Sequence, residues 1–270
     1  MKSKIHEFPK GNKTNIRKKI ALISFALLAL TTKTFAWGKE GHQMVAEIAE
    51  YYLDKSVKDS VNKYLDGTTF EEAATWMDEI KSDHHNDYMK SWHYINIEKD
   101  ATYVASEEKN IISVLQLVIS QLQNRSGQTT EEITRNIKML FHLVGDLHQP
   151  LHVGYGDDKG GNSIHVVFEG KSKKNLHQVW DETIIQKQKI NAEDCIYLAQ
   201  KLSDADIKSK KHIDVIAWMN ESRSLLPNVY AFTGENISKT YVKKNTPVIK
   251  RQLLYAGMRL AAVLEKSFKK

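Results

Sequence analysis

The sequence predicts an all-α protein: one mainly helical domain with a small β-hairpin or extended loop. Apolar residues recur at helical spacing along most of the chain, beginning with Val45, Ile48 and Leu53. The pattern changes only at residues 154–170 (GYGDDKGGNSIHVVFEG), where glycines flank a short β-branched and aromatic run. Residues 37–270 contain no repeat, low-complexity tract or linker, so we predict a single domain over that range.

The expected helices follow one another in chain order. The first covers residues 41–53, and the second covers residues 111–122. Thr129 and Glu132 have the spacing of a capping box that opens a third helix, which Pro150 should end or kink. After the glycine-rich stretch, helical periodicity returns at residues 175–188, 194–202, 213–232 and 242–268, the last two read as long helices.

Residues 1–36 have the pattern of a secretory signal peptide. A basic, polar beginning is followed by the apolar run IALISFALLAL, which at eleven residues is too short to span a bilayer as a helix. The residues around Ala36 suit cleavage after that position, so the mature chain should begin at Trp37 and be exported to the periplasm or the medium. An uncleaved N-terminal membrane anchor is the alternative.

The positive charge of the chain belongs to this leader. The whole chain carries a net charge of +6, and the leader alone carries +7, from seven lysines and one arginine against one glutamate, which leaves −1 for residues 37–270. Bulk charge therefore gives no reason to infer a nucleic-acid partner. The single cysteine, Cys195, excludes an intrachain disulfide framework, so stability must come from packing and bound metal.

Histidines and aspartates recur in a pattern that suits metal binding. His142 with Asp146, and His177 with Asp181, lie four residues apart, which places each pair on one helical face. One such pair alone would be typical of an ordinary helix surface. Two pairs, with further imidazoles and an additional carboxylate, form a mixed nitrogen and oxygen set suited to zinc. The remaining candidates are His42, Asp78, His93 and His152.

At these residues the sequence resembles the zinc-dependent single-strand-specific nucleases of moulds, plants and bacteria, type I nucleases with 3′-nucleotidase activity. That family shares an all-helical fold with the bacterial zinc phospholipases C. The C-terminal third of the chain matches only in helical character. The matching motifs, in the expected order, are W-x4-H at 37–42, W-x-D-x-I-K at 76–81, W-H-Y-I-N at 92–96, H-L-x-x-D-x-x-Q-P-L-H at 142–152, G-G-N at 160–162 and N-L-H-x-x-W-D at 175–181.

The resemblance implies three zinc ions. One would be held by Asp78, His93, His142 and Asp146; a second by His42 and the α-amine and carbonyl oxygen of Trp37, with Asp146 bridging the two; and a third by His152, His177 and Asp181. The Trp37 chelate requires a cleaved leader, because zinc can displace the proton of a free α-amine, whereas an amide nitrogen is a poor ligand. The alternative is that Trp37 only packs in the core.

The resemblance also implies the reaction. A metal-activated water would hydrolyse single-stranded DNA and RNA, and 3′-phosphomononucleotides, to 5′-phosphate products, in a monomer that needs no stable protein partner and has no membrane span after signal cleavage. Asp146 and Lys81 would be catalytic, unless Lys81 is only a solvated lysine. Tyr94 would stack on an unpaired base, Asn96 stands where some fungal members carry an aspartate that reads the base edge, and Asn162 would lie near the phosphate or serve only its turn.

Two functions other than a nuclease remain open. A zinc phospholipase C acting on phospholipid head groups is disfavoured by the last ligand, Asp181, where those enzymes carry glutamate, and by the aromatic Tyr94 after His93. The other is a non-catalytic zinc-binding or adhesive protein. Trp92, Trp180 and Trp218 are expected to pack. The histidines not expected to bind metal are His84, His85, His148, His165 and His212.

Overall fold

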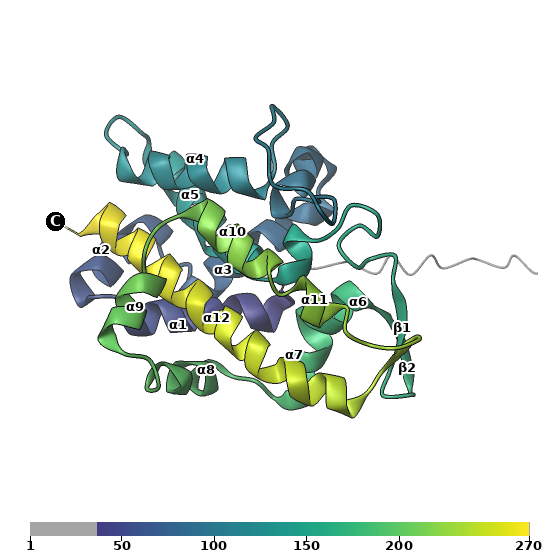
Figure 1. Cartoon of the computed structure of the whole chain (residues 1–270). Helices are drawn as coiled ribbons and strands as arrows, with labels where there is room; N and C mark the ends of the chain where they lie inside the picture. The colour runs from purple at the N-terminus through teal and green to yellow at the C-terminus, as the bar shows by residue number, and fades with distance from the viewer. Residues whose placement is uncertain (1–36, 270) are drawn as a thin grey trace, which may run out of the picture. The chain divides into compact units, whose positions relative to one another are not determined.

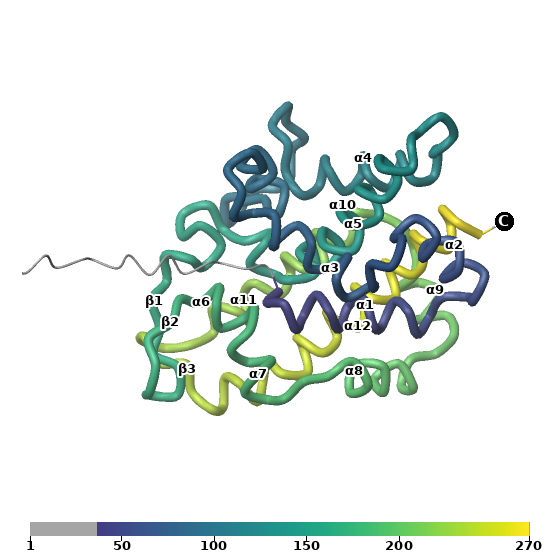
Figure 2. Tube along the Cα trace, turned by 180° about the vertical axis from the view of Figure 1, so that it is seen from behind, coloured from purple at the N-terminus to yellow at the C-terminus, as the bar shows by residue number. Residues whose placement is uncertain are grey.

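Long helices form the body of the protein in the computed structural model, which describes residues 37–269 (Figure 1). The longest, α12 (Lys239–Phe268), packs along α1 (Lys39–Tyr52) and also contacts α5 (Thr130–Leu147) and α8 (Ala192–Ala199). Seen from behind, α1, α3 (Phe70–Glu79) and α12 lie side by side at the centre (Figure 2). The predicted all-α class is confirmed. The predicted signal peptide lies outside the described residues.

Further α-helices and short 3₁₀ and π-helical segments make up the rest of the helical structure. None of the helices within residues 37–269 is long and apolar enough to cross a membrane. The remaining α-helices are α2 (Lys55–Leu65), α4 (Ile111–Gln123), α6 (Leu176–Gln178), α7 (Ile184–Gln188), α9 (Asp204–Lys210), α10 (Val215–Arg223) and α11 (Leu226–Val229), with 3₁₀ segments η1 (Ile80–Ser82), η2 (His84–His93) and η3 (Pro150–Val153) and the π-helical segment η4 (Val179–Thr183).

Local sequence signals explain where helices begin and end. The predicted capping box is present: the Thr129 hydroxyl accepts from the Glu132 amide at 3.2 Å, and the Glu132 carboxylate accepts from the Thr129 amide at 2.8 Å. The prediction of one long helix over residues 213–232 is wrong. The segment divides into α10 and α11, because Pro227 has no N–H to donate to the preceding turn.

A three-stranded sheet occupies the glycine-rich region. β1 (His165–Phe168) pairs antiparallel with β2 (Ser172–Asn175), and their turn uses positive φ angles at Glu169 (48°) and Gly170 (71°). A hairpin is therefore present, as one of the two predicted alternatives, but it extends past the predicted range of 154–170, and residues 154–164 contain no strand. β3 (Asn236–Ile237) pairs parallel to β1 from the far end of the chain. β3 could not be predicted from the sequence, because two residues are too few to show a period-2 pattern.

Close approaches between helices set the position of the site. A Cβ at Gly145 of α5 would lie 2.7 Å from His42 Nδ1 of α1, and one at Gly257 of α12 would lie 2.4 Å from the Ile48 side chain. Only glycine therefore lets α5 and α12 approach α1 this closely. As a result, the C-terminal part of α5, whose residues from Met139 to Leu147 are all buried, lies directly against the imidazole of His42.

Candidate metal centre

Eight histidine and aspartate side chains form two buried clusters at the meeting point of these helices. The first draws on α1, α3, η2 and α5, and the second on η3, α6 and η4. None of the eight is more than 8% exposed. Their nitrogen and oxygen atoms fall into groups within 4.8 Å of one another, the spacing that a metal ion needs. The first cluster is His42, Asp78, His93, His142 and Asp146, and the second is His152, His177 and Asp181.

Asp146 occupies the centre of the first cluster. Its Oδ1 lies 3.2 Å from His42 Nε2, whereas its Oδ2 lies 3.0 Å from His93 Nδ1 and 3.3 Å from His142 Nε2. Asp78 Oδ1 is 3.8 Å from His142 Nε2. The two oxygens of one carboxylate thus face two different sets of imidazoles, as expected of a carboxylate that bridges two ions.

Backbone carbonyls fix the protonation of the histidines in the second cluster. His152 Nδ1 donates to the carbonyl of His93 at 2.7 Å, and His177 Nδ1 donates to the carbonyl of Gly160 at 2.6 Å. A carbonyl only accepts, so each Nδ1 carries the hydrogen and each Nε2 is left with a lone pair. These two Nε2 atoms lie 3.2 Å apart. Two lone pairs that face each other repel, and a shared cation removes the repulsion.

Burial favours the neutral form of three of these imidazoles, the form that metal binding requires. It lowers the pKa of His152 to about 3 and the pKa values of His93 and His177 to about 4. Burial also raises the pKa of Asp181 well above its usual range, a cost that a cation beside it offsets. Within residues 37–269, both ring nitrogens of His42 and Oδ1 of Asp146 are buried without a hydrogen-bond partner. The donors present therefore fit metal ions.

Gln149 orients the Asp181 carboxylate of the second cluster, a role that the sequence pattern did not indicate. Its Nε2 donates to Asp181 Oδ1 at 2.5 Å, and its Oε1 accepts from the amide of Leu151 at 2.6 Å. Asp181 Oδ2 is then left facing His177 Nε2 at 3.2 Å. The glutamine of the H-L-x-x-D-x-x-Q-P-L-H motif was the signal available in the sequence.

Trp37 is fully buried, and the residue that follows it contacts the main chain of the second cluster. The amide of Gly38, the next residue, donates to the carbonyl of Asp181 at 2.9 Å, which holds the main chain of residues 37–38 beside the second cluster. The indole Nε1 of Trp37 is buried without a partner in the described part of the chain. Ligation of a metal through the Trp37 main chain stays a prediction.

The other predicted site residues differ in their surroundings. Lys81 Nζ donates to Asp78 Oδ1 at 3.0 Å, so this ammonium points toward the first cluster. Tyr94 is 43% exposed and lines, with Asn96, a groove of about 490 Å³. The Asn162 amide donates to the carbonyl of Lys159 at 2.9 Å, which is a turn contact, while its Oδ1 is buried without a partner among the described residues.

The remaining aromatic and imidazole side chains lie apart from the two clusters. Trp92, Trp180 and Trp218 are buried, as predicted, and Trp180 Nε1 donates to the Tyr241 hydroxyl at 2.7 Å. His148 is buried against Arg259, which donates to its Nε2 at 2.7 Å. The exposed histidines are His84, His85, His165 and His212.

A helical body with buried imidazole and carboxylate clusters defines the class: a helical protein with a candidate multi-metal centre. The chain belongs to the S1/P1 nuclease family, whose model matches residues 37–269. The resemblance seen in the motifs is thereby confirmed.

Curated relatives cover nearly the whole chain. Endonuclease 2 of Arabidopsis thaliana is 27% identical over 96% of this chain and 99% of its own length. Nuclease S1 of Aspergillus oryzae is 26% identical over 90% of this chain and 96% of its own length. Among solved structures, Clostridium perfringens alpha-toxin aligns with 87% of this chain and 65% of that one, with a TM-score of 0.46 and 14% identity.

Proposed function

We propose that this protein is an exported trinuclear-zinc phosphodiesterase that hydrolyses single-stranded DNA and RNA, and 3′-phosphomononucleotides, to 5′-phosphate products. Membership of the S1/P1 nuclease family supports the nuclease class. One observation carries the metal dependence: the unprotonated Nε2 atoms of His152 and His177 face each other at 3.2 Å. The names of the relatives, endonuclease and nuclease S1, agree with this class.

Three sets of donors would hold the ions. Asp78, His93 and His142 would form one set with one oxygen of Asp146. His42 and the main-chain amine and carbonyl of Trp37 would form another with the second oxygen of Asp146, and the third set is His152, His177 and Asp181. Zinc bound there would supply a Lewis acid that activates water and neutralises charge on the phosphoryl oxygens.

The protein's own groups have separate tasks. The Lys81 ammonium, held at Asp78, lies where it can stabilise the negative charge that develops on the phosphate. Tyr94 offers an exposed aromatic face beside the metal ligand His93, and a base can use such a face only when it is unpaired. Gln149 keeps the Asp181 carboxylate oriented by donating a hydrogen bond to its Oδ1.

Export is part of the proposal. The leader pattern of residues 1–36 predicts cleavage after Ala36, and the family match begins at residue 37. Residues 37–270 would then be the mature catalytic domain. A free α-amine at Trp37 would exist only after that cleavage, so export and assembly of the centre are linked in this proposal.

A substrate panel tests the proposal. Purified protein beginning at Trp37 is expected to hydrolyse denatured DNA, RNA and a 3′-phosphomononucleotide, to act more slowly on duplex DNA, and to lose activity in chelator until zinc is restored. Release of phosphocholine from phosphatidylcholine without nucleic-acid hydrolysis would support a zinc phospholipase C instead. Stoichiometric zinc without turnover of any substrate would point to a non-catalytic protein.

Substitution of Tyr94 by alanine tests the base platform. We expect kcat/KM on single-stranded DNA to fall by a factor that corresponds to a loss of about 1–3 kcal/mol of transition-state stabilisation, because one stacking contact is lost. Zinc content should not change. Tyr197→Ala, which removes another exposed tyrosine from α8, is the matched control and should retain wild-type kinetics. Equal losses in both variants would contradict a specific role for Tyr94.

A further inference from the structure

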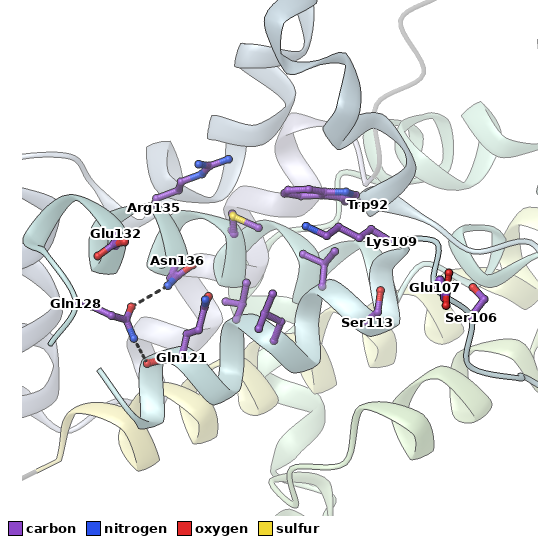
Figure 3. Close-up of a pocket in the computed structure, with 14 residues that line it drawn as sticks. Trp92, Ser106, Glu107, Lys109, Ser113, Gln121, Gln128, Glu132, Arg135 and Asn136 are labelled. Carbon is purple, nitrogen blue, oxygen red and sulfur yellow. Dashed lines mark hydrogen bonds between the residues drawn. The ribbon is translucent and has the colours of Figure 1, made fainter. Parts of the chain in front are cut away.

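A groove of about 580 Å³ lies between α4 and α5, outside the two metal-ligand clusters (Figure 3). Trp92, Lys109 and Arg135 line it, together with residues from both helices. Its volume is within the range of ligand-binding sites. We refer to it as the α4–α5 groove, and the functions assigned above do not use it.

Two cations face this groove without a carboxylate partner. Lys109 Nζ lies 5.3 Å from the centre of the Trp92 ring, and Arg135 donates to the Tyr88 hydroxyl at 2.7 Å. Within residues 37–269, neither cation is among the lysines and arginines that form ion pairs, and the carboxylate of the lining residue Glu132 accepts from the amide of Thr129. Figure 3 shows Glu107 beside Ser106, at the end away from Arg135. The groove is therefore lined by two cations that form no direct ion pair, together with the carboxylates of Glu107 and Glu132.

The floor of the groove combines apolar and amide side chains. Val114, Leu117, Val118 and Met139 supply the apolar part, and Leu117 is 47% exposed. The amides of Gln121, Gln128 and Asn136 stand beside them, with Asn136 donating to Gln128 at 3.2 Å (Figure 3). A nucleotide matches this lining, because its base has an apolar face and a hydrogen-bonding edge and its phosphate is an anion.

The α4–α5 groove is adjacent to the groove of about 490 Å³ that Tyr94 and Asn96 line. The two share Ser106 and Lys109 in their linings. Tyr94 directly follows the metal-ligand candidate His93, and Lys109 lines both grooves, so Lys109 lies between the groove of Tyr94 and the groove of Arg135.

We propose that the α4–α5 groove binds nucleotides of a single strand that lie beyond the cleavage site, with Lys109 and Arg135 contacting their phosphates. This inference rests on the proposed nuclease function and extends it. Long strands use the groove, whereas a mononucleotide in the metal centre is too short to reach it.

The test compares two charge-matched double variants of the mature enzyme. Lys109→Gln/Arg135→Gln removes both groove cations, and Lys63→Gln/Lys201→Gln removes two exposed lysines elsewhere. The substrates are a single-stranded DNA of about 20 nucleotides, longer than the roughly 4–16 that single-strand sites cover, and a 3′-phosphomononucleotide. Zinc content and circular dichroism confirm that each variant is folded and loaded.

We expect the groove variant to raise KM for the long strand about tenfold with kcat unchanged. Arg135→Gln alone, which does not alter the lining of the Tyr94 groove, should raise KM for the long strand and leave mononucleotide kinetics unchanged. The slope of log KM against log salt should fall by about 1.4, since each lost phosphate contact on a single strand removes about 0.7. The control variant and the charge-conserving Lys109→Arg/Arg135→Lys should match wild type. A groove variant with the wild-type KM and salt slope would overturn this inference alone, whereas a wild type that cleaves neither substrate would overturn the proposed function and this inference with it.

Discussion

Replacement of Asp146 by asparagine is expected to reduce hydrolysis of single-stranded DNA by orders of magnitude. Asp146 Oδ1 faces His42 at 3.2 Å, and Oδ2 faces His93 at 3.0 Å, so this carboxylate would contact two ions at once. Asparagine removes the negative charge that balances both ions and replaces one donor oxygen by an N–H donor, which cannot bind a cation. Both sites of the close pair should therefore weaken together.

The measurement pairs turnover with zinc per chain. We expect Asp146→Asn to retain the helical circular dichroism signal while it loses turnover and binds less than the wild-type complement of zinc. Asp59→Asn on the exposed face of α2 makes the same chemical change away from the clusters and should behave as wild type. Near-normal hydrolysis by Asp146→Asn would exclude the bridging assignment.

The sequence was sufficient to find the candidate ligands that lie one helical turn apart. His142 with Asp146, and His177 with Asp181, are four residues apart, and helical geometry alone places each pair on one face. Asp78 and His93 come from separate elements, so local periodicity could not place them in one site; residue type made them candidates, and the family resemblance assigned them to one metal. The structure now brings all of these side chains into two buried clusters.

Features that depend on tertiary contact were not predictable in the same way. The Gln149–Asp181 hydrogen bond joins residues 32 positions apart, and the His148–Arg259 contact joins residues 111 apart. No periodic pattern encodes such pairs. The α4–α5 groove likewise depends on how two amphipathic helices meet the segment that carries Lys109, which the composition of neither helix reveals.

A single extra residue before Trp37 is expected to weaken or abolish one zinc site and most of the activity. The proposed chelate uses the α-amine and carbonyl of Trp37, beside Asp181, whose carbonyl accepts from the Gly38 amide at 2.9 Å. An α-amine has a pKa of about 7.7–8, so zinc can displace its proton, whereas the nitrogen of an added peptide bond holds its proton far more strongly. A retained initiator methionine would therefore remove a ligand without changing any side chain.

The Trp37 side chain should matter less than the terminus. Trp37→Phe with a correctly cut N-terminus loses some packing at a fully buried position, but it also removes an indole N–H that has no hydrogen-bond partner within residues 37–269. We expect this variant to bind three zinc ions and to keep more activity than wild-type sequence with one added residue. Measurement of zinc per chain and turnover for both proteins decides whether Trp37 is a main-chain metal ligand or only a packing residue. Three zinc ions and full activity in the extended protein would show that Trp37 acts by packing alone, because conversion of its α-amine to an amide would then have no effect on zinc binding.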